Sequence, residues 1–194
     1  MGDVLVINGH PDPSPERLCA GLAAAYAQGA AQAGRSVRRL DVGALDFPLI
    51  ASRHDYEHAA PPPAIAEAQA ALTAAAHVAL IFPIWLGGPP ARLNGFLEQV
   101  LRPGFAREVS GPGRIGRPLM KGRSVRIVAT MAMPALAYRW WFMGRGVGNL
   151  RRSVLGFVGF GPIRTTYVGG AFDIPPERAR ALIEQAQALG RAAR

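Results

Sequence analysis

Five strand-like runs alternate with helical segments along this chain, and no other feature limits the possible fold as strongly. The runs predict strands at residues 4–7, 37–41, 78–82, 125–130 and 163–168. Strands that alternate with helices predict a parallel sheet with helices on both faces, joined by right-handed crossovers. We therefore expect one α/β domain over residues 1–194, with the five strands in the order 2-1-3-4-5.

This order is that of the flavodoxin-like fold, and helices are predicted between its strands. Ser14 has the place of an N-cap, Pro15 that of the first helical residue, and Gly34 that of the residue ending this helix. Further helices are expected at 64–75, 91–101, 138–142, 149–158 and from residue 175 almost to the end. The stretches 42–63 and 102–121 are predicted to be irregular, and connections of such length are usually functional or mobile.

The formal charge is +9 and comes almost wholly from arginine, because Lys121 is the only lysine. An anionic partner is one explanation, whether a nucleic acid, a membrane surface or a phosphorylated cofactor. An arginine-rich overall composition is the other. We favour composition because no basic run is long and no base-stacking aromatic motif accompanies the charge. We therefore expect no nucleic-acid partner.

No segment indicates a membrane or secreted protein. The longest apolar runs are far shorter than the roughly 18 residues expected of a membrane span, so we expect no membrane insertion. The N-terminus has neither the basic region nor the long apolar region of a signal peptide. Cys19 is the only cysteine, which excludes an internal disulfide and leaves no zinc motif. These observations favour a cytoplasmic protein.

The loop after the first strand has features of a mononucleotide-phosphate site. It reads Gly-His-Pro-Asp-Pro-Ser at residues 9–14, beyond the carboxyl end of a strand, where such sheets bind ligands. The helix N-terminus would offer N–H groups, Ser14 a hydroxyl, and Arg17 a guanidinium that grips phosphate oxygens in pairs. The alternative is that Ser14 is only a cap and Arg17 a solvated residue. His10 either hydrogen-bonds a phosphate or orders the loop.

The loop after the third strand combines glycines and prolines with one large aromatic side chain. It reads Phe-Pro-Ile-Trp-Leu-Gly-Gly-Pro-Pro from residue 82 to residue 90. Glycine lets backbone approach a ligand closely, Trp85 supplies a flat face, and exposed N–H groups could contact the edge of a planar heterocycle. The alternative is that Trp85 and Leu86 pack in the core, which the density of glycine and proline disfavours.

Four segments carry a family resemblance. They are Gly-His-Pro-Asp-Pro at 9–13, Phe-Pro-Ile-Trp-Leu-Gly-Gly-Pro-Pro-Ala-Arg-Leu-Asn-Gly-Phe at 82–96, Pro-Gly-Phe-Ala at 103–106 and Leu-Met-Lys-Gly-Arg at 119–123. The chain resembles the flavodoxin-like NAD(P)H:quinone oxidoreductases, which include DT-diaphorase, bacterial modulators of drug activity and ancillary oxidoreductases of potassium-efflux systems. The second segment is the most specific, because family members have an aromatic-bearing flavin loop there.

The resemblance implies a flavin with its phosphate in the first loop and its isoalloxazine ring over residues 83–87. It implies hydride transfer from NADPH or NADH to the flavin and then to a quinone-like acceptor, in a ping-pong cycle at a homodimer interface. FMN is favoured over FAD because the chain lacks the C-terminal extension of longer members. If the chain is instead a non-enzymatic subunit of the same fold, its partner would be a transporter or another protein.

The resemblance places residues from three loops at the flavin. The candidate cofactor-binding residues are His10, Ser14, Arg17, Leu18, Cys19, Pro83, Ile84, Trp85, Leu86, Gly87, Thr130, Met131 and Ala132. Tyr138 is the candidate catalytic residue, because it matches a tyrosine that steadies charge on the reduced flavin. No metal ligands are expected.

Two departures from the family pattern leave a second hypothesis open. Family members have Thr-Thr-Gly-Gly after the fourth strand, whereas residues 130–133 here read Thr-Met-Ala-Met. The methionines either crowd the flavin or line an apolar pocket for a bulky substrate. The usual Ser-Phe-Asn of the first loop is also absent, so Arg17 would take over phosphate binding. The leading hypothesis is a flavin-dependent NAD(P)H oxidoreductase, and the alternative is a non-enzymatic partner subunit with weak or lost flavin binding.

Overall fold

The computed structural model describes residues 2–109, 111 and 114–193, and this part of the chain contains the predicted five-stranded parallel sheet. The strands are β1 (Asp3–Asn8), β2 (Val37–Asp41), β3 (Ala75–Pro83), β4 (Ser124–Thr130) and β5 (Ile163–Val168). They pair in the order β2-β1-β3-β4-β5, and every pairing is parallel. The predicted fold class and strand order are confirmed.

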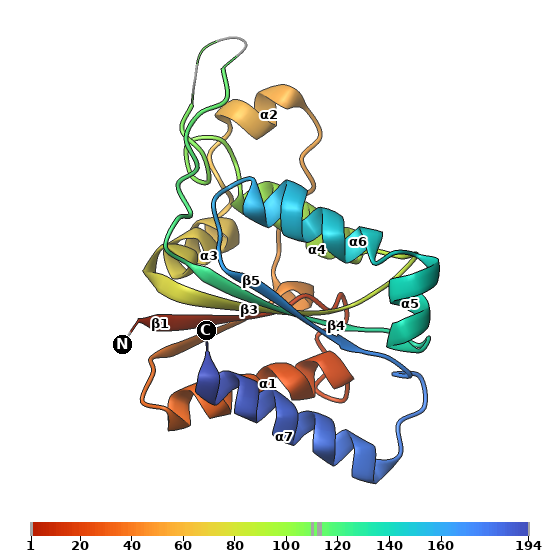
Figure 1. Ribbon diagram of the computed structural model, residues 1–194. Coiled ribbons are helices and arrows are strands. Elements are labelled where there is room, and N and C mark those ends of the chain that lie inside the picture. The colour runs from red at the N-terminus through yellow and green to blue at the C-terminus, as the bar shows by residue number, and fades with distance from the viewer. Residues whose placement is uncertain (1, 110, 112–113, 194) are drawn as a thin grey trace.

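Helices cover both faces of the sheet (Figure 1). On one face α1 (Leu18–Gln32) and α7 (Pro176–Ala192) pack side by side. The other face is covered by α3 (Pro63–Ala74), α4 (Ala91–Val100) and the π-helical segment η2 (Leu150–Gly156). The short helices α5 (Ala135–Trp141) and α6 (Arg145–Asn149) follow β4. No helix in the described ranges is long and apolar enough to cross a membrane.

The strand register brings several loops to one edge of the sheet. Asn8 at the end of β1 pairs with Ile81, and Pro83 at the end of β3 pairs with Thr130 at the end of β4. Thr130 in turn pairs with Val168, the last residue of β5. Because all the strands are parallel, the loops that follow them start from this common carboxyl edge.

The start of α1 differs from the prediction. The helix begins at Leu18, and Arg17 rather than Ser14 is its N-cap residue. Asp12 explains the difference, because its carboxylate accepts from the Ser14 N–H at 2.9 Å and from Arg17 Nε at 2.6 Å. An aspartate that bonds to the backbone two residues on holds a turn, so residues 12–17 form a turn and not the first helical turn.

The long stretches and some element ends also differ from the prediction. The stretch 42–63 contains the 3₁₀ turn η1 (Val42–Ala44) and the helix α2 (Arg53–His58), in which Ser52 caps the Asp55 N–H at 3.0 Å. β3 begins earlier than predicted, at Ala75, and a helix already begins at residue 145, before the predicted 149. Residues 110, 112 and 113 of the predicted loop 102–121 lie outside the described residues.

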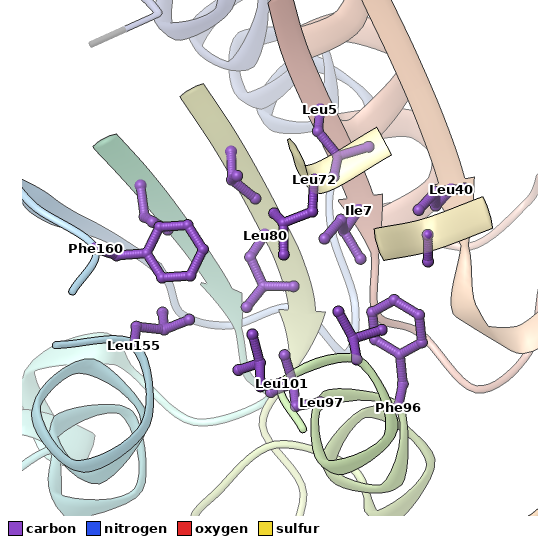
Figure 2. Close-up of a pocket in the computed structure, with 14 residues that line it drawn as sticks. Leu5, Ile7, Leu40, Leu72, Leu80, Phe96, Leu97, Leu101, Leu155 and Phe160 are labelled. Atoms are coloured by element: carbon purple, nitrogen blue, oxygen red, sulfur yellow. The ribbon is translucent and has the colours of Figure 1, made fainter. Parts of the chain in front are cut away.

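Two apolar cores lie on the two faces of the sheet. Leu5 and Leu80 pack toward α3, α4 and η2, whereas Val4 and Ala79 pack toward α1 and α7. Figure 2 shows a small cavity of about 20 Å³ in the first core, where side chains such as Leu80 and Phe160 point toward one another. The lining is apolar and offers no partner to a water or a polar ligand, so this cavity belongs to the core packing.

Candidate cofactor-binding site

A pocket of about 240 Å³ opens at the carboxyl edge of the sheet, where the loops after β1, β3, β4 and β5 meet. Most of the predicted cofactor-binding residues line it. These are His10, Leu18, Cys19, Pro83, Ile84, Trp85, Thr130, Met131 and Ala132. The other predicted residues do not line it: Ser14 and Arg17 lie in the turn before α1, and Leu86 and Gly87 at the tip of the loop after β3.

The loop after β1 is held by hydrogen bonds within itself. The buried Asn8 side chain accepts from the His10 backbone N–H at 3.2 Å and donates to Asp41 Oδ1 at 2.8 Å. His10 Nδ1 lies 3.0 Å from both the backbone nitrogen and the backbone oxygen of Asp12. Nδ1 is therefore used by the loop in either tautomer, and Nε2 is the ring nitrogen left for a ligand. The ring also meets Trp85 edge to face, with centroids 5.9 Å apart.

Arg17 and the start of α1 lie next to this loop. The Ser14 N–H and then the Arg17 guanidinium hold the pKa of the Asp12 carboxyl below its usual value. The Arg17 side chain makes no capping hydrogen bond to α1, and the Ala20 N–H donates to the Arg17 carbonyl at 2.9 Å. The N–H groups of Leu18 and Cys19 are therefore the ones in the first turn that an anion could meet. A phosphate placed there would meet the N-terminus of the helix. It would also meet the two Nη atoms of Arg17, because only Nε of this side chain donates to Asp12.

Cys19 and Thr130 form a buried, uncharged floor. Cys19 Sγ lies 3.4 Å from Thr130 Oγ1, which joins the start of α1 to the end of β4. Burial raises the pKa of the Cys19 thiol to about 11, so the thiol stays protonated at neutral pH and is a poor nucleophile. The floor of the pocket therefore suits an uncharged ring edge.

The loop after β3 ends in a tight hairpin turn over residues 85–88. The Trp85 N–H donates to the Gly88 carbonyl at 2.9 Å, and the Gly88 N–H donates to the Trp85 carbonyl at 3.0 Å. Leu86 and Gly87 have φ of 49° and 82°, which is the type I′ geometry and strains a leucine. Trp85 is 51% exposed and Leu86 is fully exposed, so neither packs in the core.

Few backbone donors in this loop remain for a ligand. The Ile84 N–H donates to the Thr130 carbonyl at 2.7 Å, the Trp85 N–H closes the turn, and Pro83 has no N–H. Among the described residues 83–87, Leu86 and Gly87 are thus the ones whose N–H groups could meet a heterocycle. If backbone donors of this loop contact a ring edge, as predicted, the donors are the N–H groups of Leu86 and Gly87 at the tip of the turn.

Tyr138 and α6 hold this turn from behind. The Tyr138 ring is fully buried, and its hydroxyl donates to the Gly87 carbonyl at 2.9 Å and accepts from the Val147 N–H at 3.2 Å. Both bonds stay within the protein, and Tyr138 does not line the pocket. At Gly146 a Cβ atom would lie 1.9 Å from the Gly87 oxygen, so α6 fits against the turn only with glycine there. Tyr138 has the contacts of a residue that positions the turn.

The loop after β4 does not fill the pocket with methionine. Met131 is buried in the core, and its N–H donates to the Val168 carbonyl at 2.8 Å. It contributes one apolar surface to the pocket, while Met133 is 37% exposed beyond it. Of the two alternatives left open by the sequence, an apolar lining is the one that this placement supports.

Two lining residues, Ala171 and Phe172, are absent from the sequence-based set. They belong to the loop after β5, which Arg178 holds by donating to the Gly169 and Gly170 carbonyls. Phe172 is 91% exposed at the pocket mouth. The sequence did contain a signal for them. Gly169, Gly170 and Phe172 directly follow β5, and the loop after β3 likewise combines two glycines with an aromatic residue.

Comparison with known proteins identifies the family of the chain. A family model described as the flavodoxin-like fold matches residues 2–192. The chain belongs to this flavodoxin-like family. The resemblance inferred from the loops at 9–13 and 82–96 is thereby confirmed at the level of the family fold. None of the curated proteins compared matches the chain.

Solved structures of the flavodoxin-like fold align over nearly the whole chain. Smu.1420 from Streptococcus mutans has a TM-score of 0.77 and 23% identity, with 98% of this chain and 99% of that chain covered. An NAD(P)H:quinone oxidoreductase from Methanothermobacter marburgensis has a TM-score of 0.73 and 20% identity, with 98% and 96% covered. An FMN-dependent NADH-azoreductase from Bacillus anthracis, in complex with FMN, has a TM-score of 0.74 and 13% identity, with both chains covered completely. At these identities the similarity establishes the fold.

Proposed function

We propose that this chain is a flavin-dependent NAD(P)H oxidoreductase that reduces a quinone-like acceptor. The pocket carries the proposal, because the loops after β1, β3 and β4 surround one cavity with Trp85 exposed at its mouth. These are the loops that the family resemblance assigns to a flavin. The named activities of structurally similar proteins, a quinone oxidoreductase and an FMN-dependent azoreductase, support the same class of reaction.

The residues present fit part of an FMN molecule. The cavity is smaller than the about 300–1,000 Å³ of most small-molecule pockets, so it would enclose one end of the ring system. The rest of the ring would lie across the open mouth between Trp85 and Phe172. The neutral floor of Cys19 and Thr130 suits the enclosed end, and the open N-terminus of α1 would hold the phosphate.

The chain's own residues would bind and orient the cofactor. A bound flavin supplies hydride transfer between NAD(P)H and the acceptor. The N–H groups of Leu86 and Gly87 would bind one ring edge and stabilise negative charge on it. Tyr138 would act through the turn, by keeping the Gly87 carbonyl and hence both N–H groups in place. The single open mouth would receive NAD(P)H and the acceptor in turn, which is the basis for proposing a ping-pong cycle.

The spectrum of the purified protein tests this function directly. After incubation with FMN and removal of free flavin, we expect a yellow protein whose visible absorption is bleached by NADPH or NADH. A soluble quinone should restore the absorption, and an azo dye should be tried as a second acceptor. A protein that stays colourless after addition of FMN or FAD would contradict the proposal and favour the non-enzymatic subunit.

Arg17→Ala should separate phosphate binding from ring binding. Removing the guanidinium is expected to weaken FMN binding about tenfold, the size expected of one charge-assisted contact. Riboflavin lacks the phosphate, so its affinity should be the same in both proteins. Flavin fluorescence titrations with the two ligands would measure this difference. Equal FMN affinity in wild type and variant would return Arg17 to the role of a solvated residue.

We also propose that the homodimer expected from the resemblance uses the groove between α2, α4, η2 and the described residues 103–109 and 114–116. This groove is lined by charges of both signs, such as Arg53, Glu98 and Arg107, together with apolar side chains such as Ile115 and Phe157. In a two-fold dimer the same patch of each subunit faces its own copy, so the patch must be complementary to itself. A patch with both positive and negative side chains can be, because each charge can pair with the opposite charge of the partner. Light scattering of the purified protein would measure the assembly.

A further inference from the structure

The positive charge of this protein is concentrated in one part of the chain. Residues 109–172 contain no aspartate and no glutamate, although they contain nine of the arginines and the single lysine. Acidic residues resume only at Asp173. The formal charge of +9 is thus carried by the segment that runs from the loop before β4 to the end of β5. A charge distributed in this way calls for a local explanation.

Exposed arginines of this segment line an open groove along the edge strand β5. They are Arg139 of α5, Arg145 of α6, Arg151 and Arg152 of η2, and Arg164 of β5. Within the described ranges, no ion pair joins any of the five to an acidic side chain. No acidic residue lines the groove either. The groove therefore presents uncompensated positive charge to an anionic partner.

Large apolar side chains stand out from α5 and the turn after it, at the end of this groove. Tyr138 points inward and is buried, whereas Trp140 is 80% exposed and Trp141 is 85% exposed. Leu136 and Met143 are also largely exposed. Met143 lines the groove itself, so the apolar and the basic side chains adjoin. We call the exposed Leu136, Trp140, Trp141 and Met143, together with the five arginines, the basic–aromatic face.

We propose that the basic–aromatic face docks this protein on a membrane surface that contains anionic lipids. Tryptophan side chains prefer the interface between headgroups and acyl chains, and arginines near them bind lipid phosphates. A peripheral contact of this kind requires exposed aromatic and aliphatic side chains beside a cationic surface, which is what α5 and the β5 groove present. It needs no membrane-spanning helix.

Charge and shape favour a lipid surface over other partners. A second copy of the chain would bring a second set of unpaired arginines to the same contact, and like charges repel across an interface. A nucleic acid could use the arginines, but it offers no hydrocarbon in which to bury Leu136 and Met143. If the proposed function holds, docking would also bring the open pocket close to acceptors dissolved in the lipid.

Vesicle sedimentation tests the proposal without any flavin or substrate. Vesicles of phosphatidylcholine alone should leave the protein in solution, whereas vesicles with about one third phosphatidylglycerol should sediment it, less so as salt is raised. Trp140→Ala/Trp141→Ala and Arg151→Ala/Arg152→Ala should each weaken binding about tenfold or more. The control is Arg38→Ala/Arg180→Ala, which removes the same charge from exposed sites on β2 and α7 and should bind as the wild type does.

Several outcomes would overturn the proposal. One is wild-type protein that stays in solution with the anionic vesicles. Another is a control variant that loses as much binding as Arg151→Ala/Arg152→Ala, since this would show attraction by net charge alone. A third is loss of a dimer in Trp140→Ala/Trp141→Ala with unchanged vesicle binding, which would assign the tryptophans to a contact between two copies. Circular dichroism of each variant confirms that it is folded before the comparison is made.

Discussion

Gly146→Ala is expected to lower FMN affinity at least about tenfold, whereas Gly148→Ala in the same helix leaves it unchanged. A Cβ at position 146 would lie 1.9 Å from the Gly87 oxygen and 2.7 Å from Gly88 Cα. Both atoms are backbone of a closed turn, so the turn must move as a unit. A Cβ at Gly148 meets nothing within 4 Å. The two substitutions make the same chemical change on the same short helix, and only one displaces the turn.

Flavin fluorescence titrations would measure the affinities, and thermal unfolding would measure the effect on stability. Gly146→Ala should also lower the free energy of unfolding by about 1–3 kcal/mol, as overpacking usually does. Gly148→Ala should leave stability unchanged or raise it by up to about 1 kcal/mol, because alanine is the better helix former. Unchanged FMN affinity in Gly146→Ala, with stability lowered, would show that the turn does not contact the flavin.

His77 is expected to make stability fall as the pH falls from 6.5 toward 4. Its ring is buried, with Nε2 2.7 Å from the Tyr26 hydroxyl and Nδ1 2.7 Å from Ser124 Oγ. Burial is the main reason that the pKa of His77 is lowered to about 4, and the positive charges of Arg126 and of nearby arginines add to the effect. The unfolded chain takes up a proton near pH 6.5, whereas the folded protein does so only near pH 4. Below pH 6.5 the unfolded state therefore binds more protons and gains stability.

A single histidine with this shift should lower the free energy of unfolding by about 2 kcal/mol between pH 6.5 and 4.5. Urea unfolding of wild type and His77→Gln at several pH values would measure it. The variant should be less stable at pH 7, because it loses buried hydrogen bonds, yet its stability should fall less with pH. His54→Gln on α2, where the ring is exposed, is the control and should keep the wild-type slope. Parallel slopes for His77→Gln and wild type would contradict the assignment.

The strand order and the place of the pocket could be predicted from short-range patterns. Runs such as 78–82 and 125–130 are buried on both faces, so their apolar character is continuous along the chain. A parallel sheet then leaves little choice about where the following loops meet. The prediction that His10, Trp85 and Thr130 share one site needed only this topology.

The details of the loop after β1 and the role of Tyr138 could not be predicted in the same way. A Ser-Pro pair before an alanine-rich segment resembles a helix start, but the Asp12 carboxylate holds residues 12–17 as a turn instead. Tyr138 has the spacing of a family tyrosine, yet its hydroxyl bonds to Gly87 and Val147. The partner in each case is a side chain or a backbone group whose position depends on other elements.

The amino-acid sequence alone determined the five-stranded parallel sheet, the edge at which its loops meet, and most of the residues lining the pocket. The sheet and its loop edge follow from hydrophobic periodicity and from glycine and proline placement, which act over a few residues, whereas the lining residues came from the family resemblance of the loops. Only the tertiary structure decided that Leu86 and Gly87 form the tip of a closed turn, that Tyr138 and Gly146 contact this turn, and that five arginines of residues 139–164 line one groove with the exposed Met143. Such contacts join residues far apart in the chain, and their geometry is set by how helices pack on the sheet.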